Sequence, residues 1–398
     1  MLPPGPREPA ALQTIEWVVR PTALLRRAQA RHGEPFTLRT AWSDAPLVLV
    51  SDPAEIKRIY AAPADVLQAG DSSAFLAPFV GPSSILILNG DAHLRQRKLM
   101  LPPFHGAALQ RWRETIAELA HAELDTWVPG RRMQALPSMQ RLTLEVIQRV
   151  IFGSRDPELR DALRGALDMT GSLPRLIAMS LRGGPTPGFR RAVERIDALV
   201  YARIDRALAA PGEGSVLDLL VASGATRAEL RDQLVTLLAA GHETTATALA
   251  WALERLARHP GTDLSDDAHI DAAVREVLRT RPVLSITARR TLQPYPLAGY
   301  TLPAGVYVAA CIYLAHRRAG TAFDPARPAP EPYTFIPFGG GTRRCLGAAF
   351  AALEMREVLR AVSQRFTLAP GVARPERMRR RSVTLAPARG GSIIPKAR

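Results

Sequence analysis

The sequence predicts a mainly α-helical protein with a minor β-rich portion. Two stretches, residues 139–153 and 226–259, carry apolar residues at the three- and four-residue spacing of buried helices. Strand-like patterns concentrate late in the chain, at residues 300–314 and 382–395. Because no internal repeat and no linker rich in Pro, Gly or Ser divides the chain, we expect residues 1–398 to form a single domain.

Composition excludes several classes of protein. The chain has 398 residues, of which 47% are hydrophobic, so it can bury a sizeable core and is not a disordered tail protein. Its two cysteines are too few for a disulfide framework, which is typical of a reducing compartment. The sequence shows no run of about 18 apolar residues and no secretory signal pattern. We therefore expect a soluble cytoplasmic protein without a membrane span.

The net charge of +15 raises the question of a nucleic-acid partner. It comes from 52 Lys and Arg against 37 Asp and Glu. Lysine is nearly absent, and arginine is spread along the chain, often in pairs. A nucleic-acid arm is more often a compact basic block. The distribution therefore predicts no nucleic-acid partner.

The elements of the first half follow from local signals. Apolar periodicity and breakers such as Pro and Gly mark where helices begin and end. The predicted elements are a strand, turn and helix over 47–60, loops over 62–92, a helical stretch from 92 to about 127 broken at 102–103, a helix ending at Gly153, and helices over 157–210 interrupted by 181–188.

The longest predicted helix is the first informative element. Thr226 and Glu229 form a capping box at its start, and Pro260 follows its end near His259. Its roughly 34 residues would span about 50 Å and are apolar on most sides, which indicates a core helix. The centre, residues 240–245 (AGHETT), is polar. It is either a partly exposed polar stripe or a locally distorted segment that presents an acid and an alcohol beside a cavity.

A glycine-rich loop ending in a cysteine is the second informative element. Three consecutive glycines in PFGGGTRRCLGAAFA (337–351) indicate a special backbone shape or a close approach. Cys345 precedes a helical run, and a helix N-terminus and neighbouring arginines favour the thiolate form. Such a thiolate can be a nucleophile, a metal ligand or an ordinary buried cysteine. Cys311 lies in an apolar strand pattern and is interpreted as core.

These motifs together resemble the cytochrome P-450 superfamily. Residues 338–347 match the pattern F-x-x-G-x-R-x-C-x-G, and 240–245 match [AG]-G-x-[DE]-T-[ST]. Glu276 and Arg279 match E-x-x-R, which lies between the other two motifs in the family's order. The likeness runs from about residue 30 to the end and is greatest to soluble bacterial members. It implies the cytochrome P-450 fold, with a long central helix over a heme.

The resemblance implies a heme b (iron protoporphyrin IX) site. Cys345 would be the thiolate ligand of the iron, and Phe338 would shield its sulfur. Two heme carboxylates would need cationic partners. The family's pattern assigns this part to His93 and Arg97 on an early helix, to Arg289 with Arg290 as the near alternative, and to Arg343.

The resemblance also assigns an acid–alcohol pair and a structural charge cluster. Glu243 and Thr244 would relay protons from solvent to the site where O2 reacts, and Thr245 would support a distortion of the helix. Glu276, Arg279 and Arg327 would hold the heme loop without taking part in the chemistry.

The resemblance specifies the substrate contacts and the redox partner less closely than the heme site. The apolar segments at the family's substrate positions predict an apolar small molecule; they are residues 75–87, 173–179, 237–238, 283–286 and Leu385. Residues 259–275 and 316–337 are shorter than usual for the family, toward the side where the electron donor docks. Electrons would come from an external ferredoxin and an NAD(P)H-dependent ferredoxin reductase, with O2 as co-substrate and the enzyme as a monomer.

The leading hypothesis is a heme-thiolate monooxygenase that hydroxylates or epoxidises a terpene, fatty acid, steroid or polyketide, within secondary metabolism. A peroxide-driven peroxygenase or another tailoring enzyme of the same fold is the first alternative. It is disfavoured because Glu243 and Thr244 are both present. A non-catalytic basic binding protein or heme sensor is the alternative from another class, and it would not explain the ordered motifs.

Overall fold

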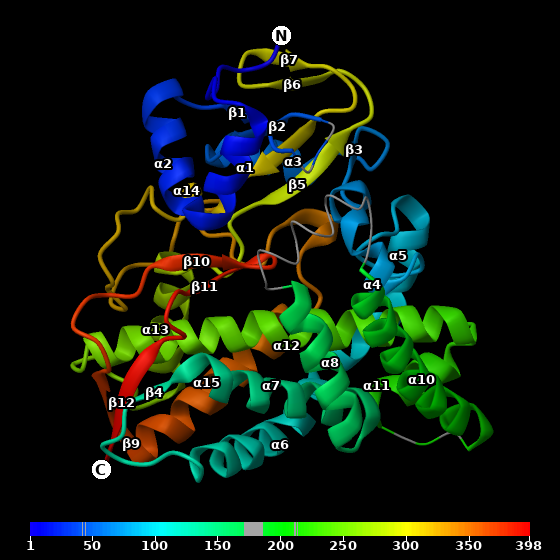
Figure 1. Cartoon of the computed structure of the whole chain (residues 1–398), viewed down its shortest axis with the longest axis vertical. Coiled ribbons are helices and arrows are strands. Elements are labelled where there is room, and N and C mark those ends of the chain that lie inside the picture. The colour runs from blue at the N-terminus through cyan, green and yellow to red at the C-terminus, as the bar shows by residue number, and fades with distance from the viewer. Residues whose placement is uncertain (42, 44, 171–185, 211, 213) are drawn as a thin grey trace.

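The computed structural model describes the whole chain except residues 42, 44, 171–185, 211 and 213. Helices form the larger part, and a smaller β-rich part lies to one side with the N-terminus, as Figure 1 shows. The predicted mainly α-helical class with a minor β-rich portion is confirmed. The single-domain organisation over 1–398 stays a prediction.

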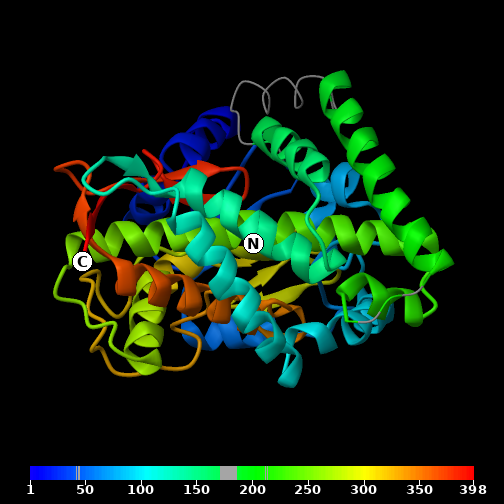
Figure 2. The same cartoon turned by 90° about the horizontal axis from the view of Figure 1, so that it is seen from below.

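The described helices include long core helices and short helical turns between them. The longest, α12, crosses the helical part from side to side in Figures 1 and 2. The α-helices are α1 (Ala10–Val19), α2 (Pro21–His32), α3 (Pro53–Ala61), α4 (Ala77–Val80), α5 (Gly90–Met100), α6 (Ala107–Leu124), α7 (Ala135–Phe152), α8 (Pro157–Thr170), α10 (Pro187–Ala209), α11 (Val216–Ala222), α12 (Arg227–Arg258), α13 (Asp267–Thr280), α14 (Ile312–Ala315) and α15 (Ala348–Arg365). The 3-10 helices are η1 (Gly70–Leu76), η2 (Pro102–Phe104) and η3 (Gly341–Arg343).

The described strands form one five-stranded sheet, in the order β1-β2-β8-β5-β3, and three smaller groups. The smaller groups are β4-β12-β9, β10-β11 and β6-β7, and β2 with β8 is the parallel pair of the main sheet. The strands are β1 (Phe36–Leu38), β2 (Leu47–Val50), β3 (Leu67–Gln68), β4 (Met133–Gln134), β5 (Thr287–Thr291), β6 (Tyr295–Leu297), β7 (Tyr300–Leu302), β8 (Tyr307–Ala310), β9 (Phe366–Pro370), β10 (Met378–Arg381), β11 (Thr384–Pro387) and β12 (Ser392–Ala397).

Local signals placed most boundaries correctly. The side chain of Asp52 caps α3, α7 ends at Gly153 with a left-handed φ of 69°, and the Thr226–Glu229 capping box begins α12. One expectation was wrong in part, because residues 312–315 form the short helix α14 and do not continue the strand pattern. A short buried apolar run fits a strand or a helix equally well, so periodicity alone could not separate them.

Helix α12 forms the centre of the largest hydrophobic core. Its side chains are buried on most sides, including Trp251, which is 0% exposed. The Trp251 indole N–H donates to the carbonyl of Leu385, 2.7 Å away, and so joins α12 to β11. Among the helices that the structure describes, none is long and apolar enough to cross a membrane.

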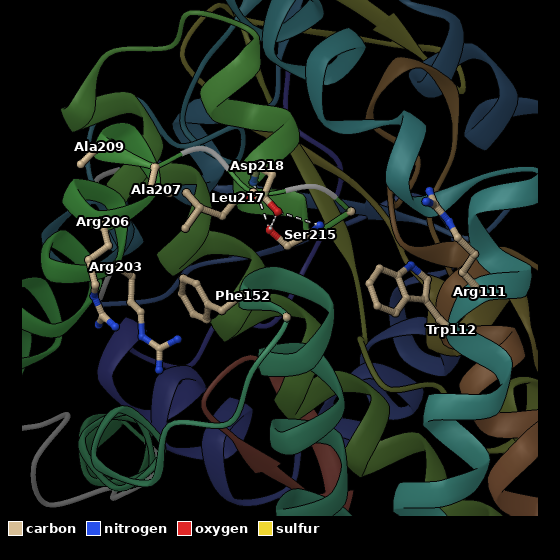
Figure 3. Close-up of a pocket in the computed structure, with 14 residues that line it drawn as sticks. Arg111, Trp112, Phe152, Arg203, Arg206, Ala207, Ala209, Ser215, Leu217 and Asp218 are labelled. Atoms are coloured by element: carbon tan, nitrogen blue, oxygen red, sulfur yellow. Dashed lines mark hydrogen bonds between the residues drawn. The ribbon is translucent and has the colours of Figure 1, made fainter.

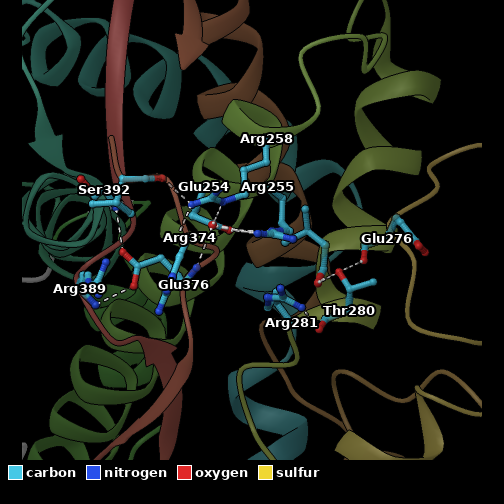
Figure 4. Close-up of polar contacts among 12 residues, drawn as sticks. Glu254, Arg255, Arg258, Glu276, Thr280, Arg281, Arg374, Glu376, Arg389 and Ser392 are labelled. Carbon is cyan, nitrogen blue, oxygen red and sulfur yellow. Dashed lines mark hydrogen bonds and ion pairs between the residues drawn. The ribbon is translucent and has the colours of Figure 1, made fainter. Parts of the chain in front are cut away.

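A buried polar network fixes the C-terminal end of α12, as Figure 4 shows. The carboxylate of Glu254 is 1% exposed and accepts hydrogen bonds from Arg255 at 2.6 and 2.8 Å and from Arg258 at 2.6 Å. Arg258 also donates to the carbonyls of residues 372–374. The Glu376 backbone N–H lies 3.3 Å from Glu254. Glu254 therefore ties the helix end to the segment that leads into β10.

Replacing this carboxylate is expected to destabilise the protein. Glu254→Gln leaves two nearly buried guanidinium groups without their anion, and breaking a buried pair costs about 3–5 kcal/mol. Urea unfolding followed by tryptophan fluorescence measures the change in the free energy of unfolding. Glu158→Gln is the matched control, because the Glu158–Arg195 pair is exposed and should be worth less than about 1 kcal/mol. Equal effects of the two substitutions would contradict the role given to Glu254.

Candidate functional site

The glycines of the Cys345 loop are explained by close packing against α3. A Cβ atom added to Gly340 would lie 2.3 Å from the ring of Tyr60, and one added to Gly341 would lie 2.2 Å from its carbonyl oxygen. Gly339 and Gly341 also have positive φ values of 67° and 63°, which other residues adopt at a cost. The loop closes where the Cys345 N–H donates to the Phe338 carbonyl at 2.9 Å.

Cys345 lies two residues before Gly347, the N-cap of α15. Its side chain is accessible to solvent, although protein surrounds it on most sides. This burial raises the pKa of the Cys345 thiol, while the Gly347 N–H, Arg97 and Arg344 act in the opposite direction. The helix-end N–H and Arg344 therefore act as the sequence predicted, whereas Arg97 takes the part expected of Arg343. Desolvation of the thiolate outweighs these groups in the protein alone. Cys311 is 0% exposed, as expected for a core residue.

Four basic groups from three separate elements lie close enough for the charges of the arginines to act on their neighbours. His93 and Arg97 come from α5, Arg289 from β5 and Arg343 from η3. Burial and then the charges of Arg343, Arg97 and Arg289 lower the pKa of His93 to about 4. Burial, Arg289 and Arg97 likewise lower the pKa of Arg343 to about 10. None of the four forms an ion pair with a described carboxylate.

Arg289 is the clearest of these unbalanced charges. Arg289 is 5% exposed, and its side chain makes no hydrogen bond or ion pair with any described residue. Its guanidinium group lies over the ring of Tyr60, 5.8 Å from the ring centre. Arg290 follows on the same strand and lies over the ring of Tyr307. Because strand residues alternate between faces, only Arg289 joins His93 and Arg343. A buried cation without an anion is costly, so the cluster is suited to an anionic ligand.

Backbone contacts hold the other two arginines of this cluster. Arg343 donates to the carbonyls of Ile85, 3.0 Å away, and Leu88, and to the Asn89 side chain at 3.0 Å. Arg97 donates to the Arg344 carbonyl at 2.8 Å. These bonds join the 85–89 segment and α5 to the Cys345 loop, so the cations and the thiol belong to one site.

The polar centre of α12 forms a seam with α7. Glu243 accepts a hydrogen bond from Gln140 at 2.8 Å and one from Arg381 of β10 at 3.0 Å. The Thr143 hydroxyl lies 2.9 Å from Nδ1 of His242, and burial, followed by the charge of Arg381, lowers the pKa of His242 to about 3. The acid is therefore fixed from two neighbouring elements.

Thr244 lies on the accessible side of α12. Its hydroxyl donates to the Ala240 carbonyl at 2.6 Å, and both residues are less buried than most of the helix. The expected distortion does not interrupt the helix, which is continuous from Arg227 to Arg258. Close packing explains the glycine at position 241. A Cβ atom there would lie 3.0 Å from Cδ1 of Ile147, so the glycine allows α7 to approach α12. Thr245 is buried.

The Glu276–Arg279 pair is buried and supports the segment before the Cys345 loop. Arg279 donates to Glu276 at 2.6 and 2.7 Å and to the carbonyls of His316, Gly320 and Ala322. Nε of Arg327 lies 3.9 Å from Glu276, beyond hydrogen-bond distance. Arg327 therefore adds charge to the cluster without a direct bond.

The segments predicted to contact substrate differ in accessibility. Phe75 is 65% exposed, and Leu237 and residues 283–286 are partly accessible. Leu238 and Leu385 are buried in the core. Residues 173–179 lie outside the described residues. Sequence reasoning missed Gln140 and Arg381, because neither is near Glu243 in the chain and no local motif marks them.

The structure also contains a separate cavity of about 840 Å³, whose lining residues Figure 3 shows. It is lined by parts of α6, α7, α10 and α11, including Trp112, Phe152, Arg203 and Asp218. None of the site residues predicted from the sequence lines it. We therefore place the candidate site at Cys345 and the basic cluster, where the charges are unbalanced.

Comparison with solved structures shows what this fold is similar to. A retinoic acid-bound cyanobacterial CYP120A1 aligns with a TM-score of 0.83 at 22% identity and covers 100% of both chains. The heme domain of cytochrome P450DA aligns with a TM-score of 0.86 at 22% identity, over 100% of this chain and 98% of that one. CYP175A1 from Thermus thermophilus aligns with a TM-score of 0.78 at 28% identity over 95% of both chains.

Sequence comparison identifies the family. Cytochrome P450 135B1 of Mycobacterium tuberculosis is 38% identical over 439 residues, which cover 100% of this chain and 92% of the relative. Cytochrome P450 138 of the same species is 36% identical, over 100% and 97%. The Cytochrome P450 family model matches residues 3–264 and 262–393, and its two matches meet within the segment predicted to be short. The chain belongs to the cytochrome P450 family.

Proposed function

We propose that the chain is a heme-thiolate monooxygenase that inserts one atom of O2 into an apolar small molecule, by hydroxylation or epoxidation. Enzymes of this family are monooxygenases that bind heme b. The finer assignment of a terpene, fatty acid, steroid or polyketide as substrate rests on the apolar, partly accessible segments 75–87 and 283–286.

The observation that carries the proposal is the uncompensated basic cluster beside the Cys345 loop. Heme b has two carboxylates, and Arg289, His93, Arg97 and Arg343 supply cationic or hydrogen-bonding partners that have no described counter-charge. The accessible thiol of Cys345 is a ligand type that iron accepts. Phe338 belongs to the same loop, where it would shield the sulfur. The residues present therefore fit heme b.

When bound, heme supplies the chemistry of O2 activation. The polypeptide has the role of delivering protons and excluding bulk water. Thr244 presents a hydroxyl on the accessible side of α12, where it can order a water molecule. Glu243 precedes Thr244 on the same helix and is buried. It forms an ion pair with Arg381, whose side chain is 30% exposed and extends toward the surface. This arrangement supports a proton route from solvent through Glu243 to Thr244, and hence a monooxygenase over a peroxygenase.

The proposal extends to partners and location. We propose that a ferredoxin and its NAD(P)H-dependent reductase supply the electrons to a monomeric cytoplasmic enzyme of secondary metabolism. Arg344 and Lys98 are exposed near the Cys345 loop and on α5. An acidic ferredoxin would be steered toward such a basic surface.

The first prediction concerns the iron ligand. Cys345→Ser should abolish the red-shifted thiolate band in the difference spectrum of the reduced, CO-bound protein, because an alcohol does not replace the thiolate. Cys311→Ala, which removes the core cysteine, should retain the band. A wild-type protein that binds heme but lacks the band would overturn the proposed function.

The second prediction concerns the heme carboxylates. Arg289→Gln should accelerate heme transfer to excess apomyoglobin by about 10- to 100-fold, since a hydrogen bond to a charged group contributes about 1.5–3 kcal/mol. Arg290→Gln is the matched control on the opposite face of β5 and should leave the rate within about twofold. Equal rates for both variants would remove Arg289 from the site.

The third prediction concerns proton delivery. Thr244→Val keeps the shape of the side chain but removes the hydroxyl, so product formed per NAD(P)H should fall by about tenfold, with more O2 released as hydrogen peroxide. Thr247→Val is the control, because the Thr247 hydroxyl is buried one turn away without a hydrogen-bond partner in the described structure. Unchanged coupling in Thr244→Val would exclude this role.

A further inference from the structure

We propose that His316 is a positioning residue for the iron-ligand loop: its ring, neutral and protonated on Nδ1, joins helix α13 to the segment that leads into Cys345. The inference rests on the proposed function only in taking Cys345 as the iron ligand. No sequence motif assigned a role to this histidine.

The two ring nitrogens of His316 contact groups that fix its tautomer. The Ile336 backbone N–H lies 2.8 Å from Nε2, and the Leu278 carbonyl lies 3.2 Å from Nδ1. An amide N–H can only donate and a carbonyl can only accept. Nε2 must therefore be the acceptor and Nδ1 must carry the proton.

The surroundings of the ring enforce the neutral form. His316 is 0% exposed, and its ring packs against Phe335 with the ring centres 5.1 Å apart. Burial lowers the pKa of His316 to about 3, and the positive charge of Arg279 acts in the same direction. A charged ring would also lose the bond from Ile336, since it has no lone pair left to accept it.

Hydrogen bonds, together with short steps along the backbone, connect His316 with Cys345. On one side, Arg279 donates to the His316 carbonyl at 3.1 Å and pairs with Glu276. On the other side, the Gly339 N–H donates to the Ile336 carbonyl at 3.0 Å, at the start of the glycine-rich turn. The Cys345 N–H then donates to the carbonyl of Phe338 at 2.9 Å. Ile336 is thus held by His316 through its N–H and holds the turn through its carbonyl.

Replacement of the ring tests whether it positions the thiolate. His316→Phe keeps a planar ring against Phe335 but leaves the Ile336 N–H without a partner. His316→Gln retains both an acceptor and a donor. In the heme-loaded full chain, the share of the reduced, CO-bound protein that shows the thiolate band should fall at least twofold in His316→Phe. That share should stay near the wild-type level in His316→Gln.

His259→Phe is the matched control. His259 also packs against a phenylalanine, Phe323, with ring centres 4.7 Å apart. Its ring makes no hydrogen bond with the described residues. Substitution there should leave the thiolate band unchanged. A loss of the band equal to that of His316→Phe would show a packing effect and would overturn the inference.

A second measurement does not depend on activity or on the band. Nitrogen-15 NMR of histidine-labelled protein, with the His316 signals assigned by their loss in His316→Gln, should show a neutral ring protonated on Nδ1. A proton on Nε2, or a charged ring at neutral pH, would overturn the inference even if His316→Phe fails to fold.

The outcomes separate this inference from the proposed function. If wild-type protein binds heme without a thiolate band, the proposed function fails while the NMR result stands by itself. If the wild type shows the band and His316→Phe retains it fully, the positioning role fails and the proposed function is untouched.

Discussion

The buried ion pair between Glu276 and Arg279 is the interaction on which the candidate site depends most. It satisfies a carboxylate and a guanidinium in the interior, and its remaining donors bind the carbonyls of residues 316, 320 and 322. Breaking a buried pair would leave a bare charge and free carbonyls together. The path of the chain between α14 and the Cys345 loop is therefore set by electrostatics at α13 as well as by packing.

The site itself has the opposite electrostatic character. Around Cys345, three arginines gather with His93 and with no described carboxylate to balance them, and the charges of the arginines lower the pKa of His93. A protein gains no stability from such a cluster by itself, because like charges repel and burial removes water. The cluster makes physical sense when an anionic cofactor supplies the missing charge. The glycines of the loop serve the same end, since they allow the chain to pass Tyr60 at a distance that no side chain would permit.

Helix α12 combines core packing with polar function. Gly241 allows close contact with α7, whereas His242 and Glu243 on the same turn form hydrogen bonds to α7 and β10. A purely apolar seam would pack as well but would not hold a carboxylate beside the accessible Thr244. Because Arg381 is partly exposed, this polar seam connects the interior of the protein with its surface.

Much of this protein could be predicted from its sequence by itself. The capping box at Thr226, the stop at Gly153 and the Cys345 loop are local signals, in which a few neighbouring residues determine backbone geometry. The ordered motifs sufficed for the family, which the comparisons then showed.

Only the tertiary structure decided which distant residues meet. It placed Arg289 and Arg290 on opposite faces of β5. It brought Gln140 and Arg381 to Glu243. It also placed His316 between Leu278 and Ile336. It also showed that Gly241 serves packing and does not interrupt the helix. These contacts join residues far apart in the chain, and their energies arise from burial and alignment. The spacing of neighbouring residues predicts which face of a helix is buried, but it does not determine which distant residue that face meets.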